Sequence, residues 1–195
     1  MYREKLIVYY SDQRDLAYGQ KLVHQVSYDL KTWEAPVDDV AYADYYARPG
    51  MTTVARLPNY KYIMTYEYGG GPGFSGYSFP VYYRISESPL EFNSSTGYPV
   101  AAGAVHPTSS PYIVWSPAGG ENGTIIVSSG SYSEIFINKA LGAVGQWTMI
   151  ATPQPAAYTR HLRVMPQRDR LLIMGAGHLP PSTTNNVSLS VISVP

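Results

Sequence analysis

The stretch Thr52–Tyr68, TTVARLPNYKYIMTYEY, contains the pattern on which the rest of the chain is built. Runs of β-branched and aromatic residues flank the turn formers Pro58 and Asn59, which predicts two strands joined by a tight turn. A third apolar run, VYYRISESPLEF, follows over Val81–Phe92. The unit therefore consists of a strand, a tight turn, a second strand, and a third strand that ends near an aromatic residue.

The same unit recurs twice further along the chain. PYIVWSPAGGENGTIIVSSG (111–130) is followed by EIFINKALGAVGQW (134–147), and HLRVMPQRDRLLIMGAG (161–177) is followed by NVSLSVISV (186–194). No segment keeps the spacing of an amphipathic helix over more than about two turns. Periods of roughly 45 to 60 residues with three or four strands each are typical of propeller blades, so the chain is predicted to be all-β and to form a β-propeller.

The first part of the chain is predicted to be an incomplete unit. KLIVYYSD (5–12) and QKLVHQVSYDLKTW (20–33) resemble the back of a unit whose first strand is absent. With the three units that follow, residues 1–195 amount to about three and a half blades. We therefore expect a single, incomplete propeller domain.

Composition excludes several classes of function. The 195 residues are enough for one domain with a sizeable core, the formal net charge is zero and only 14% of residues are charged, so neither nucleic acid nor a membrane surface is an expected partner. Cysteine is absent, which excludes disulfides and thiolate chemistry. The 19 tyrosines against 4 phenylalanines suit half-buried strands and sites where an aromatic face needs a polar tip, as in carbohydrate-binding β proteins.

The sequence gives little information on localisation. No apolar run reaches the length of a membrane span, and MYREKLIVYY lacks the features of a signal peptide. Three glycosylation sequons, at Asn93, Asn122 and Asn186, are a weak indication of export.

Common catalytic and cofactor motifs are absent or misleading. GPGFSG (71–76) matches a dinucleotide-binding string, but YSFPVYY follows it where a helix should begin. No G-x-S-x-G elbow occurs, and the four histidines lack the spacing of a zinc site. Neither a metal nor an organic cofactor is expected.

Polar residues collect instead at predicted strand ends. Glu67 lies between Tyr66 and Tyr68 at the end of an apolar run, just before a group of glycines. Other candidates of this kind are Asp12, Arg14, His24, Arg48 and Arg160. In a propeller, strand-end loops of different blades converge near the axis, and a carboxylate among such groups suits glycoside hydrolysis. The alternative is that Glu67 is tolerated at a strand edge and that the arginines are ordinary surface residues.

Two stretches resemble a turn found in sialidase-like propellers. SYDLKTW (27–33) resembles the Asp-box hairpin, in which a Ser, an Asp and a Trp hold the turn, and SESPLEF (86–92) resembles a degenerate version. The alternative for either stretch is an ordinary polar hairpin closed by an aromatic residue.

A more specific resemblance runs along essentially the whole chain. It is carried by KLIVYYSDQRD, GQKLVHQ, DLKTW, RPGMTTVARLPNYKYIMTYEYGGG, WSPAGGENGTIIVSS and NNVSLSVISV. Together these resemble glycoside hydrolase family 93, the secreted fungal exo-α-1,5-L-arabinanases, which are six-bladed, sialidase-like propellers that release arabinobiose from linear arabinan with retention. The resemblance implies that Glu67 is one of two catalytic carboxylates. It makes further residues candidates for contacts with an arabinan substrate: Asp12, Arg14, His24, Arg48, Tyr66, Tyr68 and Arg160.

The chain also departs from the family pattern. The resemblance implies a second glutamate in a Trp-Glu-Pro-like segment ahead of the strand KLIVYY, and no such segment is present in the sequence. We therefore expect the C-terminal portion of a longer, extracellular family member, with N-terminal blades missing, unpaired edges that favour self-association and an activity that truncation can abolish. The rival interpretations are a non-catalytic sugar-binding propeller, a sialidase-like hydrolase, and a purely structural or interaction propeller.

Overall fold

The computed structural model describes residues 2, 4–178, 183 and 185–194, and these form four antiparallel sheets. The first sheet contains β1 (Leu6–Asp12), β2 (Lys21–Ser27) and β3 (Val37–Val40). The second contains β4 (Gly50–Arg56), β5 (Tyr62–Glu67), β6 (Val81–Ser86) and β7 (Tyr98–Pro99), with the short 3-10 helix η1 (Phe92–Ser94) before β7. The third contains β8 (Tyr112–Ser116), β9 (Thr124–Ser128), β10 (Ile135–Asn138) and β11 (Trp147–Ile150). The fourth contains β12 (His161–Val164), β13 (Arg170–Gly175) and β14 (Ser188–Ser193).

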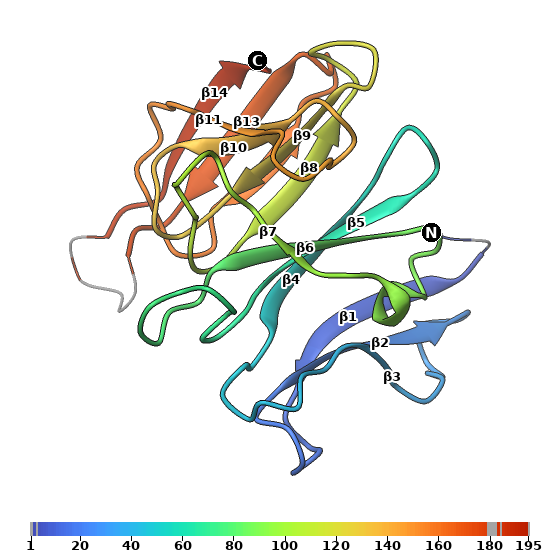
Figure 1. Ribbon diagram of the computed structural model, residues 1–195. Helices are drawn as coiled ribbons and strands as arrows, with labels where there is room; N and C mark the ends of the chain where they lie inside the picture. Colours follow the sequence, from blue (N-terminus) through green and yellow to red (C-terminus); the bar gives the residue numbers. More distant parts are fainter. Residues whose placement is uncertain (1, 3, 179–182, 184, 195) are drawn as a thin grey trace.

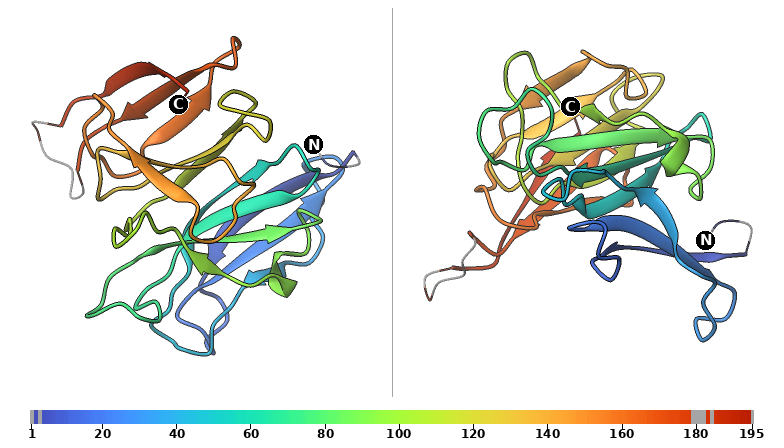
Figure 2. Two further views of the ribbon diagram at one scale, coloured as in Figure 1. Left: turned by 45° about the horizontal axis from the view of Figure 1, so that its top comes forward. Right: turned by 60° about the horizontal axis from the view of Figure 1, so that its bottom comes forward.

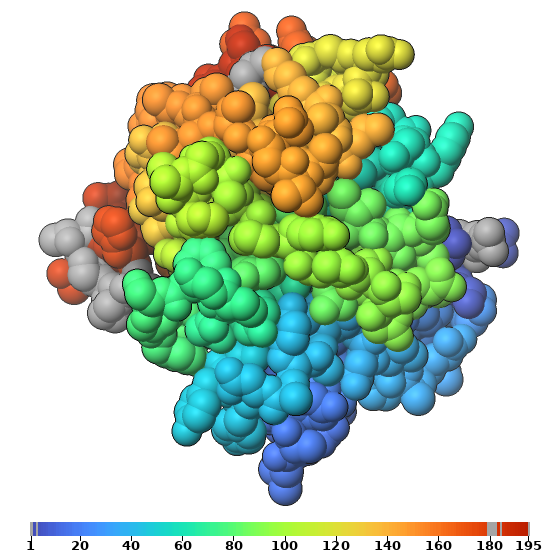
Figure 3. Space-filling view, in the orientation of Figure 1, coloured from blue at the N-terminus to red at the C-terminus, as the bar shows by residue number. Residues whose placement is uncertain are grey.

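The sheets succeed one another in chain order, from the blue sheet to the red sheet (Figure 1), and two further views show the same succession (Figure 2). In the space-filling view, segments of successive sheets pack directly against one another (Figure 3). No α-helix occurs in the described part of the chain, and none of its helices is long and apolar enough to cross a membrane. The all-β prediction is therefore confirmed.

The inner strands have apolar residues at consecutive positions because sheets stack on both of their faces. Successive residues of a strand point to opposite faces of its sheet. In β9, Ile125 and Val127 belong to the core between the second and third sheets, whereas Ile126 belongs to the core between the third and fourth. Both faces of an inner sheet are covered, so every residue of Thr124–Ser128 is buried.

The two end sheets have three strands each, and the two inner sheets have four. The turn between β2 and β3 contains the stretch 27–33, and the connection between β6 and β7 contains the stretch 86–92. β2 is therefore the counterpart of β6, and β1 is the counterpart of β5. Among the described residues, the first sheet thus has no counterpart of β4.

The turn 27–33 is held by its own side chains. Ser27 Oγ accepts hydrogen bonds from the backbone N–H groups of Asp29 (3.3 Å) and Leu30 (2.8 Å). Asp29 Oδ1 accepts from the backbone N–H groups of Lys31 and Thr32, both at 2.8 Å. Bonds of this kind lower the pKa of Asp29 and fix a tight turn. Trp33 is 36% exposed, and the assignment of an Asp-box stays a prediction.

Candidate active site

Glu67 lies at the last position of β5, where the strand meets the start of β4. Gly50 of β4 is its partner across the ladder, and the next regular pair is Thr53 with Thr65, so β4 contains one extra residue in between. This irregularity is a β-bulge, a device that often re-aims side chains beside active sites. Met51 lies within it with φ of 54°. The sequence pattern predicted the strand end but not the bulge.

The carboxylate of Glu67 is half-buried and has one described hydrogen-bond donor. The backbone N–H of Ser110 donates to Glu67 Oε2 at 2.9 Å. Desolvation by burial raises the pKa of Glu67, and the hydrogen bond from Ser110 opposes this effect. No other side chain of the described residues contributes to the shift. One oxygen is thus held in place, while the other has no described partner.

Ser110 joins three successive sheets at this point. It precedes β8, its N–H binds Glu67 of the second sheet, and its Oγ accepts from the N–H of Thr159, which precedes β12, at 3.1 Å. Tyr158 extends the link, because its hydroxyl donates to Met51 Sδ at 3.7 Å. The loops that enter β4, β8 and β12 therefore meet around Glu67.

These loops contain a concentration of unusual backbone conformations. Non-glycine residues with positive φ in these loops and in the adjoining bulge of β4 are Arg48 (37°), Met51 (54°), Ser109 (66°), Ser110 (36°) and Thr159 (54°). Such conformations cost about 1–3 kcal/mol each and persist where the surroundings impose them, often at functional sites. Their grouping beside a half-buried carboxylate supports a functional site here.

Asp12 and Arg14 form an ion pair at the end of β1. Arg14 donates from Nε to Asp12 Oδ1 at 2.8 Å and from Nη2 to Asp12 Oδ2 at 2.7 Å. Hydrogen bonds from Arg14 lower the pKa of Asp12 to about 2. The Arg14 side chain is 70% exposed and that of Asp12 only 9%. The exposed side chain of the pair is that of Arg14. Asp12 ends β1, the counterpart of β5, which ends at Glu67.

Arg48 and Tyr68 lie on loops next to the same strand ends. Arg48 is exposed two residues before Gly50, and its carbonyl is near Gln20 Nε2, which donates to Pro49 O at 2.9 Å. Tyr68 is half-buried directly after Glu67, and its ring stacks on that of Tyr42 with centroids 4.1 Å apart. Both stay candidates for substrate contacts.

The structure places Tyr66 and His24 in the interior, and their roles in substrate contacts stay predictions. Tyr66 is 0% exposed, and its hydroxyl is 2.7 Å from that of Tyr42. Its side chain faces the core between the first and second sheets, since neighbours along a strand alternate. His24 is 3% exposed, and its Nδ1 lies 2.9 Å from Oδ1 of the buried Asp39. Neither side chain lies on the surface next to Glu67.

Arg160 lies in the interior as well. It is 0% exposed, and its guanidinium donates to the backbone carbonyls of Tyr132 (3.1 Å), Ser133 (2.8 Å) and Glu134 (2.9 Å). Burial lowers its pKa to about 10. Arg160 therefore ties the entry of β12 to the loop before β10, and its contact with a substrate stays a prediction.

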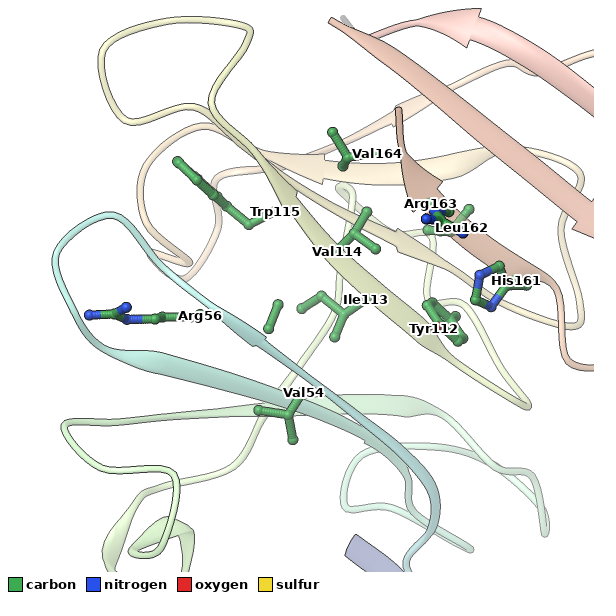
Figure 4. A pocket seen from close by; sticks show the side chains of 11 residues that line it. Val54, Arg56, Tyr112, Ile113, Val114, Trp115, His161, Leu162, Arg163 and Val164 are labelled. Carbon is green, nitrogen blue, oxygen red and sulfur yellow. The ribbon is translucent and has the colours of Figure 1, made fainter. Parts of the chain in front are cut away.

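One cavity lies away from Glu67. It has a volume of about 490 Å³ and is lined by the first strands of three sheets, through residues 54–56, 112–115 and 161–164 (Figure 4). Arg56, Arg163, His161 and Tyr112 are the charged or titratable members of its lining, which contains no carboxylate. The described residues also contain no group of three potential metal ligands.

Sequence reasoning missed a smaller recess beside Ser110. It has a volume of about 260 Å³ and is lined by Ser109, Gly130, Ser131, Tyr158 and His178. These residues lie in loops at one edge of the third and fourth sheets. The recurrence of the unit could have indicated them, because the loop before β8 and the loop before β12 occupy the same place as the loop 48–50 before β4.

Comparison with known proteins identifies the lineage. No protein-family model matches the chain, and no curated protein matches it. Among solved structures, the GH93 α-L-arabinofuranosidase of Fusarium graminearum in complex with arabinobiose is 55% identical, with a TM-score of 0.95 over 99% of this chain and 56% of that chain. The chain belongs to glycoside hydrolase family 93.

A second family 93 structure agrees. The Penicillium chrysogenum α-L-arabinanase complexed with arabinobiose is 50% identical, with a TM-score of 0.94 over 99% of this chain and 55% of that chain. The chain thus spans little more than half the length of these two relatives. An intramolecular trans-sialidase from Ruminococcus gnavus, 12% identical with a TM-score of 0.60 over 97% of this chain and 40% of that one, shares the fold alone. The family resemblance and the partial propeller fold predicted from the sequence are both confirmed.

Proposed function

We propose that this family 93 chain contributes Glu67 as one of two catalytic carboxyl groups of an exo-acting, retaining hydrolase that releases arabinobiose from linear α-1,5-arabinan. The observation that carries the proposal is the environment of Glu67: a strand-end carboxylate, desolvated, held through one oxygen by Ser110 N–H and framed by strained loops. Two relatives with at least 50% identity were solved with arabinobiose, which supports the choice of substrate.

Retaining hydrolysis needs a second carboxyl group about 5–5.5 Å from the first. No carboxylate of the described residues influences the pKa of Glu67. We propose that the partner comes from a part of the propeller outside residues 1–195. Without it, the chain is a sugar-binding scaffold with one half of the catalytic pair.

A sialidase-like activity has less support. Recognition of an acidic sugar needs arginines directed at the substrate carboxylate. Arg160 donates to backbone carbonyls instead, and so does the buried Arg84, which binds Asp39 O at 3.0 Å and Phe92 O at 2.9 Å. Because both arginines already bind backbone carbonyls, a neutral arabinan substrate fits the site better than an acidic sugar.

Disaccharide release tests the activity. The full-length native protein is incubated with linear arabinan, and arabinobiose is quantified by anion-exchange chromatography. Glu67→Gln is expected to lower kcat by about 10²–10⁴-fold, the usual contribution of a catalytic acid or base. The control is Glu121→Gln, an exposed glutamate in the turn between β8 and β9, which should keep full activity. Full activity of Glu67→Gln would refute the assignment.

Azide rescue of Glu67→Ala then identifies its role. If Glu67 is the nucleophile, azide attacks the anomeric carbon directly as the glycosidic bond breaks, and the product is a glycosyl azide of inverted configuration. If Glu67 is the acid/base, azide displaces the enzyme carboxylate from the covalent intermediate, and the product keeps its configuration. NMR of the azide product distinguishes the two.

An extracellular location is part of the same proposal. Arabinan is a polymer outside the cell, and the sequons at Asn93 and Asn122 both lie on exposed residues. Treatment of the native protein with an N-glycanase should lower its mass if either sequon is occupied. An unchanged mass would remove this support for export.

A further inference from the structure

We propose that Arg160 is a positioning residue for Glu67, because two sets of contacts that depend on Arg160 converge on Ser110. Ser110 is the residue whose backbone N–H donates to Glu67 Oε2 at 2.9 Å. The inference rests on the proposed function for the role of Glu67 in hydrolysis. The contacts that carry it can be tested without any turnover.

The guanidinium of Arg160 fixes a loop of the main chain. Arg160 is 0% exposed, and its three shortest hydrogen bonds go from Nη1 to Tyr132 O (3.1 Å) and Ser133 O (2.8 Å) and from Nη2 to Glu134 O (2.9 Å). A planar guanidinium offers its donors in a rigid fork, so it holds these three consecutive carbonyls in one arrangement. The loop 129–134, between β9 and β10, is therefore fixed at its end by Arg160.

Burial of this cation has a cost that its contacts must offset. Desolvation lowers the pKa of Arg160 to about 10, which still leaves the group protonated at neutral pH. No ion pair between Arg160 and a carboxylate is found among the described residues. A buried charge of this kind is stable only when its hydrogen-bonding groups are satisfied. Carbonyls of the loop 129–134 satisfy them, so the guanidinium and the loop stabilise each other.

The first link from Arg160 to Ser110 runs along the main chain. Thr159 directly precedes Arg160, and its backbone N–H donates to Ser110 Oγ at 3.1 Å. The backbone of Arg160 is itself fixed, because Ser128 Oγ donates to Arg160 O at 3.1 Å. Thr159 has a φ of 54°, a conformation that persists only where the surroundings impose it. Contacts at both the side chain and the carbonyl of Arg160 therefore keep the Thr159 N–H directed at Ser110.

The second link runs through the loop that the guanidinium holds. Gly130 N–H donates to Ser109 O at 2.8 Å, and Ser131 N–H donates to Thr108 O at 3.2 Å. The N–H of Thr108 donates in turn to Ser131 Oγ at 2.9 Å. These bonds fix the two residues that directly precede Ser110. Ser110 is thus held through its side chain by one link and through its preceding backbone by the other.

Loss of the Arg160 guanidinium is therefore expected to weaken the hydrogen bond from Ser110 to Glu67. That hydrogen bond lowers the pKa of Glu67 against the larger effect of desolvation, and no other side chain of the described residues contributes to the shift. A misdirected N–H should raise the pKa of Glu67 further and leave its carboxylate less well oriented. An arginine with a purely structural role would lower stability without either effect.

Two variants of the full-length protein test the inference. Arg160→Met removes every donor, and Arg160→Lys keeps the charge but replaces the planar fork with a single ammonium. Carbon-13 NMR should show a raised pKa of Glu67 in both, with the smaller rise in Arg160→Lys. On linear arabinan, kcat should fall about 10- to 100-fold in Arg160→Met and about 3- to 10-fold in Arg160→Lys. KM should change by less than about threefold, because Arg160 acts through Ser110.

Arg84→Met is the matched control. Arg84 is also buried, and its Nη1 donates to the backbone carbonyls of Asp39 (3.0 Å) and Phe92 (2.9 Å). Its loss should lower Tm, as the loss of Arg160 does, because buried carbonyls lose their donors in both variants. The pKa of Glu67 and kcat should not change in Arg84→Met, since Arg84 is not among the causes of the pKa shift of Glu67.

The outcomes separate the two proposals. If native protein releases no arabinobiose but the pKa of Glu67 rises in the Arg160 variants, the hydrolase proposal fails and the positioning role stands. An unchanged pKa of Glu67 in both variants overturns the positioning role, and Arg160→Lys alone decides if Arg160→Met does not fold. An active protein whose kcat is unchanged in both variants overturns it as well. So does an equal rise of the Glu67 pKa in Arg84→Met, because the effect would then be one of general stability.

Discussion

The first and second sheets are built alike, yet the carboxylates at equivalent strand ends have opposite environments. Asp12 ends β1 and Glu67 ends β5, and these two strands are counterparts. Arg14 lowers the pKa of Asp12 to about 2, whereas desolvation raises the pKa of Glu67. Pairs of acidic groups whose surroundings separate their pKa values in this way often differ in role. At equivalent positions on the fold, the immediate neighbours of a carboxylate therefore decide the direction of its pKa shift.

The largest expected difference between the two is in turnover. Glu67→Gln should lower kcat/KM on arabino-oligosaccharides by about 10²–10⁴-fold. Asp12→Asn should lower it by about tenfold or less, mainly through KM, because Asp12 is already neutralised by Arg14 and can act only in binding. Steady-state kinetics of the full-length protein measure both. Equal losses in kcat would break the comparison.

Carboxyl titration should show a smaller but direct difference. Removing the guanidinium with Arg14→Ala should return the pKa of Asp12 from about 2 toward its ordinary value of 3.8, because the hydrogen bonds from Arg14 are the largest cause of the shift. The pKa of Glu67 should not change, since Arg14 does not contribute to it. Carbon-13 NMR of labelled carboxyl groups follows both residues in one sample. A parallel shift at Glu67 would mean that the two sites are coupled.

Thermal unfolding should show the smallest difference, of opposite sign at the two positions. Because the pKa of Asp12 is lower in the folded chain than in the unfolded chain, ionised Asp12 stabilises the fold at pH values above its unfolded pKa. This stabilisation is lost as the pH falls toward 2. The pKa of Glu67 is higher in the folded chain than in the unfolded chain, so its effect on stability has the opposite sign. At pH values above its unfolded pKa, ionisation of Glu67 destabilises the fold. At pH 7, Asp12→Asn should lower Tm by about 2–4 °C and Glu67→Gln should raise it by a similar amount.

Repeating the Tm measurement at acidic pH tests the same comparison more directly. At pH 3, Glu67 is protonated in both the folded and the unfolded chain, so the gain from Glu67→Gln should vanish. Part of the loss from Asp12→Asn should remain, because folded Asp12 is still ionised there. A Tm of Glu67→Gln below that of the native protein at pH 7 would contradict a desolvated Glu67.

Local patterns explain why the fold was accessible from sequence. The strands are short and bounded by turn formers, and the unit Thr52–Phe92 recurs, so the missing first strand could be predicted from comparison of the units alone. The interior position of Tyr66 was also accessible. Its neighbour Glu67 was assigned to the site, and strict alternation along a strand sends adjacent side chains to opposite faces.

Arg160 and Ser110 show where sequence reasoning stops. The three shortest hydrogen bonds of Arg160 go to carbonyls of residues 132–134, more than two dozen positions away and without any side-chain signal. Ser110 acts through its backbone N–H, which every residue except proline has, so nothing in its identity marks it as the partner of Glu67. Contacts made by the backbone across sheets become visible only in three dimensions.

The turn 27–33 closes the end of its sheet opposite Asp12, and the connection 86–92 begins at the end of its sheet opposite Glu67. One end of these two sheets therefore has the turn 27–33 and the start of the connection 86–92, while the opposite end has Asp12, Glu67 and the loops around Glu67. A tether or solid support attached at the end with the turn 27–33, for example through a cysteine introduced at the exposed Lys31, would leave the opposite end accessible to a polymer chain. Since residues 1–195 contain no cysteine, such a label would attach to this part of the protein at a single point.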